Sequence, residues 1–232
     1  MTPDDSQLIL FTVACAALAV AILLPFAIGM GWLLARKDWP GKALVETLFM
    51  LPLVMPPVVT GLILLHLFGK NGPVGGFLEH QLGIEIIFTW KAVVIAMAVM
   101  SFPLVLGCIR SAFEETPPHL ESAARTLGGT PWRVFLKITL PLARRGIVAG
   151  AILGFSRAIG EFGATVMVAG FIPGLTETLP LAIYRSVQSG DDNRAWLLAA
   201  VSVLVSIASV LITRTFLDRR PKVPQNSQID LR

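Results

Sequence analysis

The stretch LILFTVACAALAVAILLPFAIGMGWLLA, at residues 8–35, contains no charged side chain in 28 consecutive positions. An α-helix rises about 1.5 Å per residue, so about 20 apolar residues are enough to cross a hydrocarbon layer of about 30 Å. The whole chain is 54% hydrophobic and only 15% charged, whereas a soluble domain carries about a quarter charged residues. The stretch therefore predicts a helix that crosses a membrane.

Four further apolar runs follow, at residues 48–68, 92–109, 146–170 and 195–213. The run at 146–170 contains Arg157 and Glu161, and the other three lack Lys, Arg, Asp and Glu. Strands of a membrane β-barrel would alternate apolar and polar residues over about ten positions, and the sequence has no such alternation. We therefore expect an all-α integral membrane protein with about five transmembrane helices, in one membrane domain over residues 1–220. The polar, proline-containing residues 221–232 predict a flexible cytoplasmic tail.

Lys and Arg are distributed unequally between the two sides of these runs. Of the nineteen, fourteen lie after the first run, around residues 110–145 or in the C-terminal tail; four lie in the two other loops, and Arg157 lies inside a run. Basic residues near the ends of membrane helices are retained on the cytoplasmic side. The distribution predicts an external N-terminus and a cytoplasmic C-terminus. It also explains the net charge of +4 without a nucleic-acid partner.

The loop at residues 110–145 contains a short cytoplasmic helix with marked ends. Thr116 suits an N-cap, Pro117 suits the first helical position, and Gly128-Gly129 terminates the element. One helix face carries small or aliphatic side chains with the spacing i, i+3, i+4 and i+7, namely Leu120, Ala123, Ala124 and Leu127. Such a face suits docking into a groove of another protein, and the alternative is an amphipathic helix that lies on the membrane surface.

At this helix the chain resembles the permease subunits of bacterial ABC importers. Their inner loop follows the pattern Glu-Ala-Ala, three residues, Gly, nine residues, Ile-x-Leu-Pro. Here both spacings are kept by Ser122-Ala123-Ala124, Gly128 and Ile138-Thr139-Leu140-Pro141. Ser122 stands where the family has Glu, and Glu121 directly precedes it. The resemblance implies a coupling helix within residues 116–131 that contacts an ATPase subunit through Glu121, Ser122, Ala123, Ala124, Leu127 and Gly128.

A narrower resemblance links the chain to the molybdate permease branch and its sulfate relatives. The stretches that carry it are WPGKAL at 39–44, LPLVMPPVVTG at 51–61, RAIGEFGAT at 157–165 and IPG at 172–174. The resemblance implies an inner-membrane importer for a tetrahedral oxyanion, with molybdate first, tungstate next and sulfate or thiosulfate as the runner-up. It also implies three kinds of partner besides membrane lipid: a second copy of the chain, two copies of an ABC ATPase and an external oxyanion-binding protein.

The sequence contains no phosphate-binding Gly-x-x-x-x-Gly-Lys-Ser/Thr loop, so ATP and Mg²⁺ are expected to act on the partner ATPase. It also contains no arrangement of residues typical of a catalytic or metal site. We expect no catalytic residue, no metal and no directly bound cofactor, which disfavours a membrane enzyme. A membrane anchor that moves no solute is the remaining alternative, and it would need few buried charges and no broken helices.

Candidate pathway or gate residues lie where the apolar runs are interrupted or charged. They are Pro56, Pro57, Thr60, Gly61, Arg157, Gly160, Glu161 and Gly163. Freed backbone groups are tolerated in a membrane where they are buried in protein or line a wet cavity, and Pro103 is expected to interrupt the third run in the same way. Small residues also allow close helix packing, which is the alternative for the glycines. Arg157 and Glu161, four residues apart, either lock the helix packing or lie beside the anion route.

Overall fold

The computed structural model describes residues 3–217, and within that range the chain consists of helices and loops without a strand. The all-α membrane fold expected from the sequence is confirmed. Four helical segments in this range are long and apolar enough to cross a membrane, and a bent pair of shorter helices would make a fifth span. The elements are α1 (Pro3–Arg36), α2 (Lys42–Val54), α3 (Pro57–Phe68), α4 (Gly75–Leu82), α5 (Trp90–Glu114), α6 (Pro118–Thr126), α7 (Pro131–Val134), a π-helical turn η1 (Phe135–Thr139), α8 (Leu140–Ile159), α9 (Gly163–Ala169), α10 (Leu179–Gln188) and α11 (Asp192–Leu217). The predicted tail at 221–232 lies outside the described residues.

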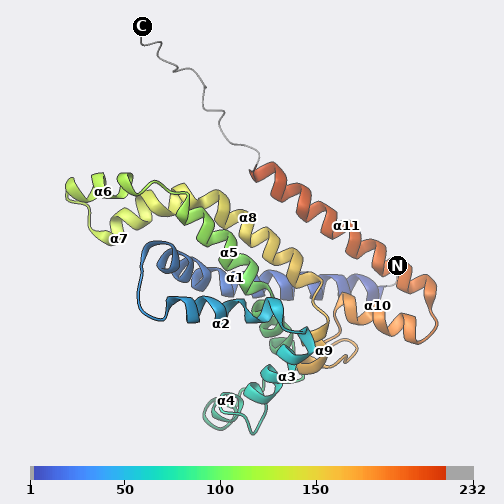
Figure 1. Cartoon of the computed structure of the whole chain (residues 1–232). Helices are drawn as coiled ribbons and strands as arrows, with labels where there is room; N and C mark the ends of the chain where they lie inside the picture. The colour runs from blue at the N-terminus through green and yellow to red at the C-terminus, as the bar shows by residue number, and fades with distance from the viewer. Residues whose placement is uncertain (1–2, 218–232) are drawn as a thin grey trace.

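The centre of the molecule is the packing of α5 against α1 and α8 (Figure 1). Small residues allow these helices to approach closely, as is usual between membrane helices. A Cβ added at Gly154 of α8 would lie 2.3 Å from Cγ2 of Val105 on α5, and Ala16, Ala19 and Ala27 of α1 are completely buried. By contrast, α11 is mostly exposed and lies at the outside of the bundle.

The second apolar run is not a straight helix. It divides into α2 and α3, whose axes differ by 113°. The residue before a proline is driven to an extended conformation, and Met55 and Pro56 have ψ values of 147° and 131° before α3 begins at Pro57. Two successive X-Pro steps therefore turn the chain sharply. Pro103 behaves differently, because α5 continues through it; the expected interruption of the third run is wrong.

The predicted run at 146–170 is also wrong in its extent. The helical segment of that span covers residues 131–159, and α9 is a separate short helix after a break at residues 160–162. Glycine disfavours helix continuation, and Gly160 leaves the helical conformation with φ −83° and ψ 6°. Arg157 therefore lies in the last turn of α8 and not near the middle of a span.

The elongated bundle has two distinct ends (Figure 1). The helices α6 and α7 lie at one end, and the start of α1 lies with α10 at the other. At the second end, Arg194 of α11 forms an ion pair with Asp5 of α1 at 2.9 Å. The backbone N–H of Leu179 donates to Thr12 Oγ1 on α1 at 2.9 Å. These bonds tie the beginning of the chain to its last helices.

Candidate coupling helix and pathway

The short helix α6 begins one residue later than a Thr116 cap would place it. Pro117 occupies the N-cap position and Pro118 the first helical position. The Thr116 hydroxyl instead donates to the carbonyl of Ala112 on α5 at 3.0 Å, so the predicted N-cap is wrong. The end of the helix lies where the sequence placed it, because Gly128 adopts φ +83°, a left-handed conformation that glycine reaches without strain.

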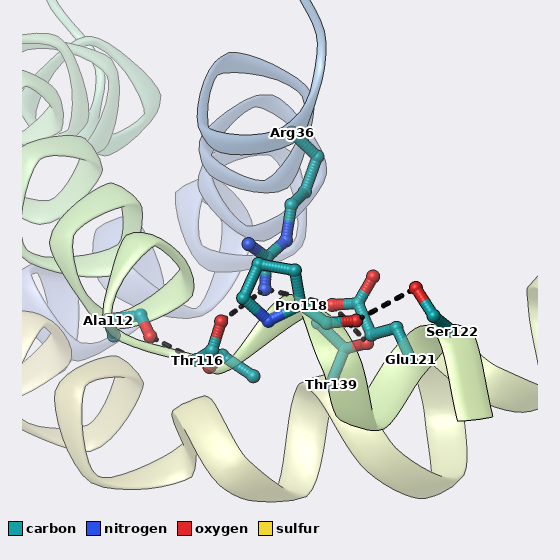
Figure 2. A network of polar contacts seen from close by, with 7 residues as sticks. All are labelled: Arg36, Ala112, Thr116, Pro118, Glu121, Ser122 and Thr139. Carbon is teal, nitrogen blue, oxygen red and sulfur yellow. Dashed lines mark hydrogen bonds and ion pairs between the residues drawn. The ribbon is translucent and has the colours of Figure 1, made fainter. Parts of the chain in front are cut away.

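Glu121 attaches α6 to the body of the protein. Figure 2 shows Arg36, at the end of α1, reaching the carboxylate of Glu121, with Nη2 at 2.9 Å from Oε1. The same nitrogen donates to the Thr116 carbonyl at 2.7 Å, and Thr139 of η1 donates its hydroxyl to Glu121 Oε1 at 3.0 Å. We call Arg36, Thr116, Glu121 and Thr139 the Glu121 cluster. It joins α1, α6 and η1.

Glu121 is the one predicted coupling residue that is buried. Glu121 was expected to contact an ATPase, but it is 8% exposed and engaged within its own chain. Its carboxylate therefore contacts Arg36 and Thr139 of its own chain. Ser122 itself is exposed and donates to the Pro118 carbonyl at 3.2 Å.

The other predicted coupling residues face outward. Ala123 and Gly128 are exposed, Ala124 is half-buried, and Leu127 is 89% exposed. Trp132 of α7, which no sequence pattern marked, is also strongly exposed. An apolar surface at the tip of an anchored helix is available for docking to another protein.

Two of the predicted pathway elements meet in space. A Cβ added at Gly61 of α3 would lie 2.7 Å from Cβ of Met167 on α9, and one added at Gly163 would lie 2.7 Å from Cβ of Pro57. Only glycine permits this approach of the two short helices. The break in the second run therefore lies against the break in the fourth, and Pro57, Gly61 and Gly163 come together there.

Arg157 and Glu161 form the ion pair that their spacing allowed. Arg157 Nη1 lies 2.8 Å from Glu161 Oε2, and Glu161 Oε1 accepts from the backbone N–H of Ala164 at 2.8 Å. The Glu161 side chain is 2% exposed and that of Arg157 is 30% exposed. The carboxylate thus bridges the last turn of α8 and the first turn of α9. Gly160 is exposed within this break, and Pro56 is exposed in the break of the second run.

Thr60 lies in α3 next to this meeting point and is 5% exposed. Its hydroxyl has no hydrogen-bond partner among the described residues, and the same holds for Ser101 of α5 and Thr165 of α9. Buried hydroxyls are normally paired. These three therefore hold unused donors in the interior of the protein.

A cavity of about 720 Å³ lies between α2, α5 and α8, toward the α6 end of the molecule. Its wall is mostly apolar and includes small residues such as Gly107, Gly146 and Ala149, with the charged side chains Arg145 and Glu115. In the sequence, Arg145 is one of several basic residues at positions 110–145. The small residues Gly146 and Ala149, which follow Arg145 in the sequence, could have indicated a cavity beside it.

The chain is similar to known membrane transport proteins over most of its length. The sequence model of the family described as the binding-protein-dependent transport system inner membrane component matches residues 27–223. A molybdenum transport system permease protein of Escherichia coli strain K12 is 45% identical over 92% of this chain and 93% of its own length. A sulfate transport system permease protein of the same organism is 37% identical over 84% of this chain and 70% of its own length. In fold, the chain is similar to an inward-facing structure of the MetNI methionine ABC transporter, with a TM-score of 0.64, 18% identity and coverage of 93% and 99%.

Proposed function

Because the chain belongs to the family of binding-protein-dependent transport system inner membrane components, we propose that it is the membrane subunit of an importer for molybdate, with ATP and Mg²⁺ used by a separate ATPase. The assignment of molybdate as the substrate rests on the 45% identity to the molybdenum permease of Escherichia coli, over 92% of the chain. The sulfate permease is more distant, at 37% over 84%. Tungstate, which shares the shape and charge of molybdate, is expected to use the same route.

The exposed tip of α6 is the proposed contact with the ATPase. Its outward face consists of small side chains and Leu127, which allow close docking in a groove. The Glu121 cluster supports this role, because a helix that transmits movement must be firmly joined to the membrane helices. A hydrolysis-driven displacement of α6 would pass to α1 through Arg36 and to α8 through Thr139.

The anion route is proposed to run between two copies of the chain, bounded by α2, α5 and α8. The cavity of about 720 Å³ would form its inner half on each copy. The contact between α3 and α9, with the unpaired Thr60 hydroxyl beside it, would form the closure toward the outside. An external oxyanion-binding protein would deliver the substrate there. Alternating access then requires α3 and α9 to separate while the inner half closes.

Uptake measurements test the proposal. The chain is expressed with its ATPase and external binding protein in cells that lack their own molybdate importer, and the entry of labelled molybdate is followed. We expect saturable uptake that an equal concentration of tungstate suppresses strongly and sulfate only weakly. Uptake of sulfate or thiosulfate without molybdate would move the assignment to the runner-up substrate. An assembled complex that takes up none of these anions would favour a membrane anchor.

A further inference from the structure

A second hollow lies at the α6 end of the molecule, between α6, η1 and the first turns of α8. Its volume is about 610 Å³. Three cationic side chains line it, Lys137, Arg144 and Arg145, and the remaining wall is apolar, formed by Leu120, Ile138, Pro141 and Leu142. We call this hollow the basic groove. No Asp or Glu is among the residues that line it.

The three cations of the basic groove differ from the five described arginines that have a carboxylate partner. Arg36, Arg110, Arg157, Arg185 and Arg194 each form an ion pair with a carboxylate. Lys137, Arg144 and Arg145 are exposed, and within residues 3–217 no ion pair involves them. Retention of basic residues on the cytoplasmic side explains their presence in this loop. It does not explain their gathering around one concave surface.

The groove adjoins the cavity between α2, α5 and α8. Arg145 and Leu142 line both hollows. An anion in the cavity would have Arg145 and Glu115 in its wall, whereas an anion in the groove would have Arg145, Arg144 and Lys137 and no carboxylate. Guanidinium groups bind the oxygens of tetrahedral oxyanions through paired hydrogen bonds, and an apolar wall weakens the screening of such contacts by water.

We propose that the basic groove is a cytoplasmic binding site for a tetrahedral dianion, at which the transported oxyanion is held as it leaves the cavity. The proposal rests on the proposed function for the identity of the anion. The position beside the cavity, with Arg145 in the wall of both hollows, favours a free oxyanion over a lipid phosphate or an acidic surface of the ATPase. Because Leu120 belongs to α6, an occupied groove would also contact the coupling helix.

The test measures the electrostatic potential and the occupancy of the groove separately. Ile138→Cys is introduced into the Cys15→Ala, Cys108→Ala chain, which is purified with its ATPase and placed in nanodiscs of neutral lipid. The rate of modification by a negatively charged thiosulfonate is compared with that by a neutral one. We expect the charged reagent to be favoured at least about fivefold, and addition of molybdate to slow the modification. If Ile138→Cys does not assemble, Leu142→Cys is used at the same groove.

Two variants provide the comparison. Lys137→Gln, Arg144→Gln and Arg145→Gln together should abolish both the preference for the charged reagent and the protection by molybdate. The control is Arg125→Gln with Arg133→Gln, which removes two exposed cations that do not line the groove, and it should retain both effects. Equal rates for the two reagents in the unaltered groove would overturn the proposal.

The other occupants give different results. Protection by phosphatidylglycerol in the nanodisc but not by molybdate would show a lipid site, and a cysteine that reacts only after removal of the ATPase would show a protein interface; each overturns the proposal. Uptake by the unaltered importer is measured in parallel. Molybdate protection in a complex that does not transport molybdate would support the groove and reject the proposed function, whereas molybdate transport without protection would do the reverse.

Discussion

Gly61 and Gly163 occupy positions where any side chain would meet the neighbouring helix. The added Cβ at Gly61 would lie 2.7 Å from Met167 Cβ and 2.9 Å from the Cα of Ala164. The second contact involves backbone, so rotation of a side chain cannot relieve it. The two helices can approach this closely only because glycine stands at both positions.

Gly61→Ala is expected to separate α3 from α9. The displacement should cost about 1–3 kcal/mol, the usual range for overpacking, and reduce both thermal stability and uptake. Thermal unfolding of the purified protein and molybdate uptake measure the two effects. Gly29→Ala is the matched control, because no atom lies within 4 Å of its added Cβ. An unchanged Gly61→Ala protein would contradict the close contact.

The Arg157–Glu161 pair is expected to act as a unit in transport. Either charge left alone in a poorly hydrated site is penalised, whereas both together compensate each other. Arg157→Gln and Glu161→Gln should each lower uptake at normal protein levels, and the double variant should lose less than the sum, with a coupling of about 0.5–3 kcal/mol. Strictly additive losses would mean that the pair is not coupled. Reduced amounts of dimer with normal activity per dimer would indicate a purely structural role.

Among the helices, α6 has two faces with different tasks. Glu121 points into the protein, where it meets α1 and η1. Ala123 and Leu127 point away from it. A helix that only rested on a membrane surface would have no need of a buried ion pair at its base, so the Glu121 cluster favours a helix that transmits force.

Changes on the two faces of α6 should have different consequences. Glu121→Ala leaves Arg36 without its carboxylate and should destabilise the protein by about 3 kcal/mol; Ser122→Ala, at an exposed neighbour, should have little effect. Ala123→Trp should leave stability unchanged but uncouple ATP hydrolysis from uptake. Ala123→Ser, which adds little bulk at the same position, should retain coupling. Thermal unfolding, ATPase activity and uptake separate these outcomes. If Glu121→Ala loses coupling without losing stability, Glu121 contacts the ATPase directly.

In the whole molecule, α6 and α7 lie at one end and the start of α1 lies at the other (Figure 1). The basic residues around 110–145 and the Glu121 cluster lie at the α6 end. The Asp5–Arg194 ion pair lies at the other end and joins α1 to α11. An ATPase in the cytoplasm can reach α6 only if that end faces inward, so the direction in which the chain crosses the membrane decides whether the proposed coupling can operate.

The N-terminus is predicted to be external and the C-terminus cytoplasmic, because fourteen Lys and Arg lie on one side and four on the other. Reporter fusions measure this directly. A reporter active only in the cytoplasm should give a signal at the C-terminus and none at the N-terminus. The opposite pattern would place α6 outside the cell and remove its access to ATP-driven partners.

The amino-acid sequence was enough to predict the membrane class, the helical fold, the short helix that ends before Gly128, and the spacing that pairs Arg157 with Glu161. These features depend on hydropathy, segment length and neighbours within one or two helical turns, which any single sequence displays. The bend at Pro56-Pro57 was visible as a break, but its angle of 113° was not.

The packing of the helices was needed to show which breaks meet, which side of α6 is buried and which cations line a cavity. The contact of Gly61 with α9 joins residues about a hundred positions apart, and hydropathy does not distinguish an apolar residue facing lipid from one facing protein. Successive residues on a helix point about 100° apart, so neither the inward direction of Glu121 nor the outward direction of Ser122 follows from their order in the chain. Arg145 lines a cavity because α2, α5 and α8 enclose the space beside it, and this packing is not visible in the sequence.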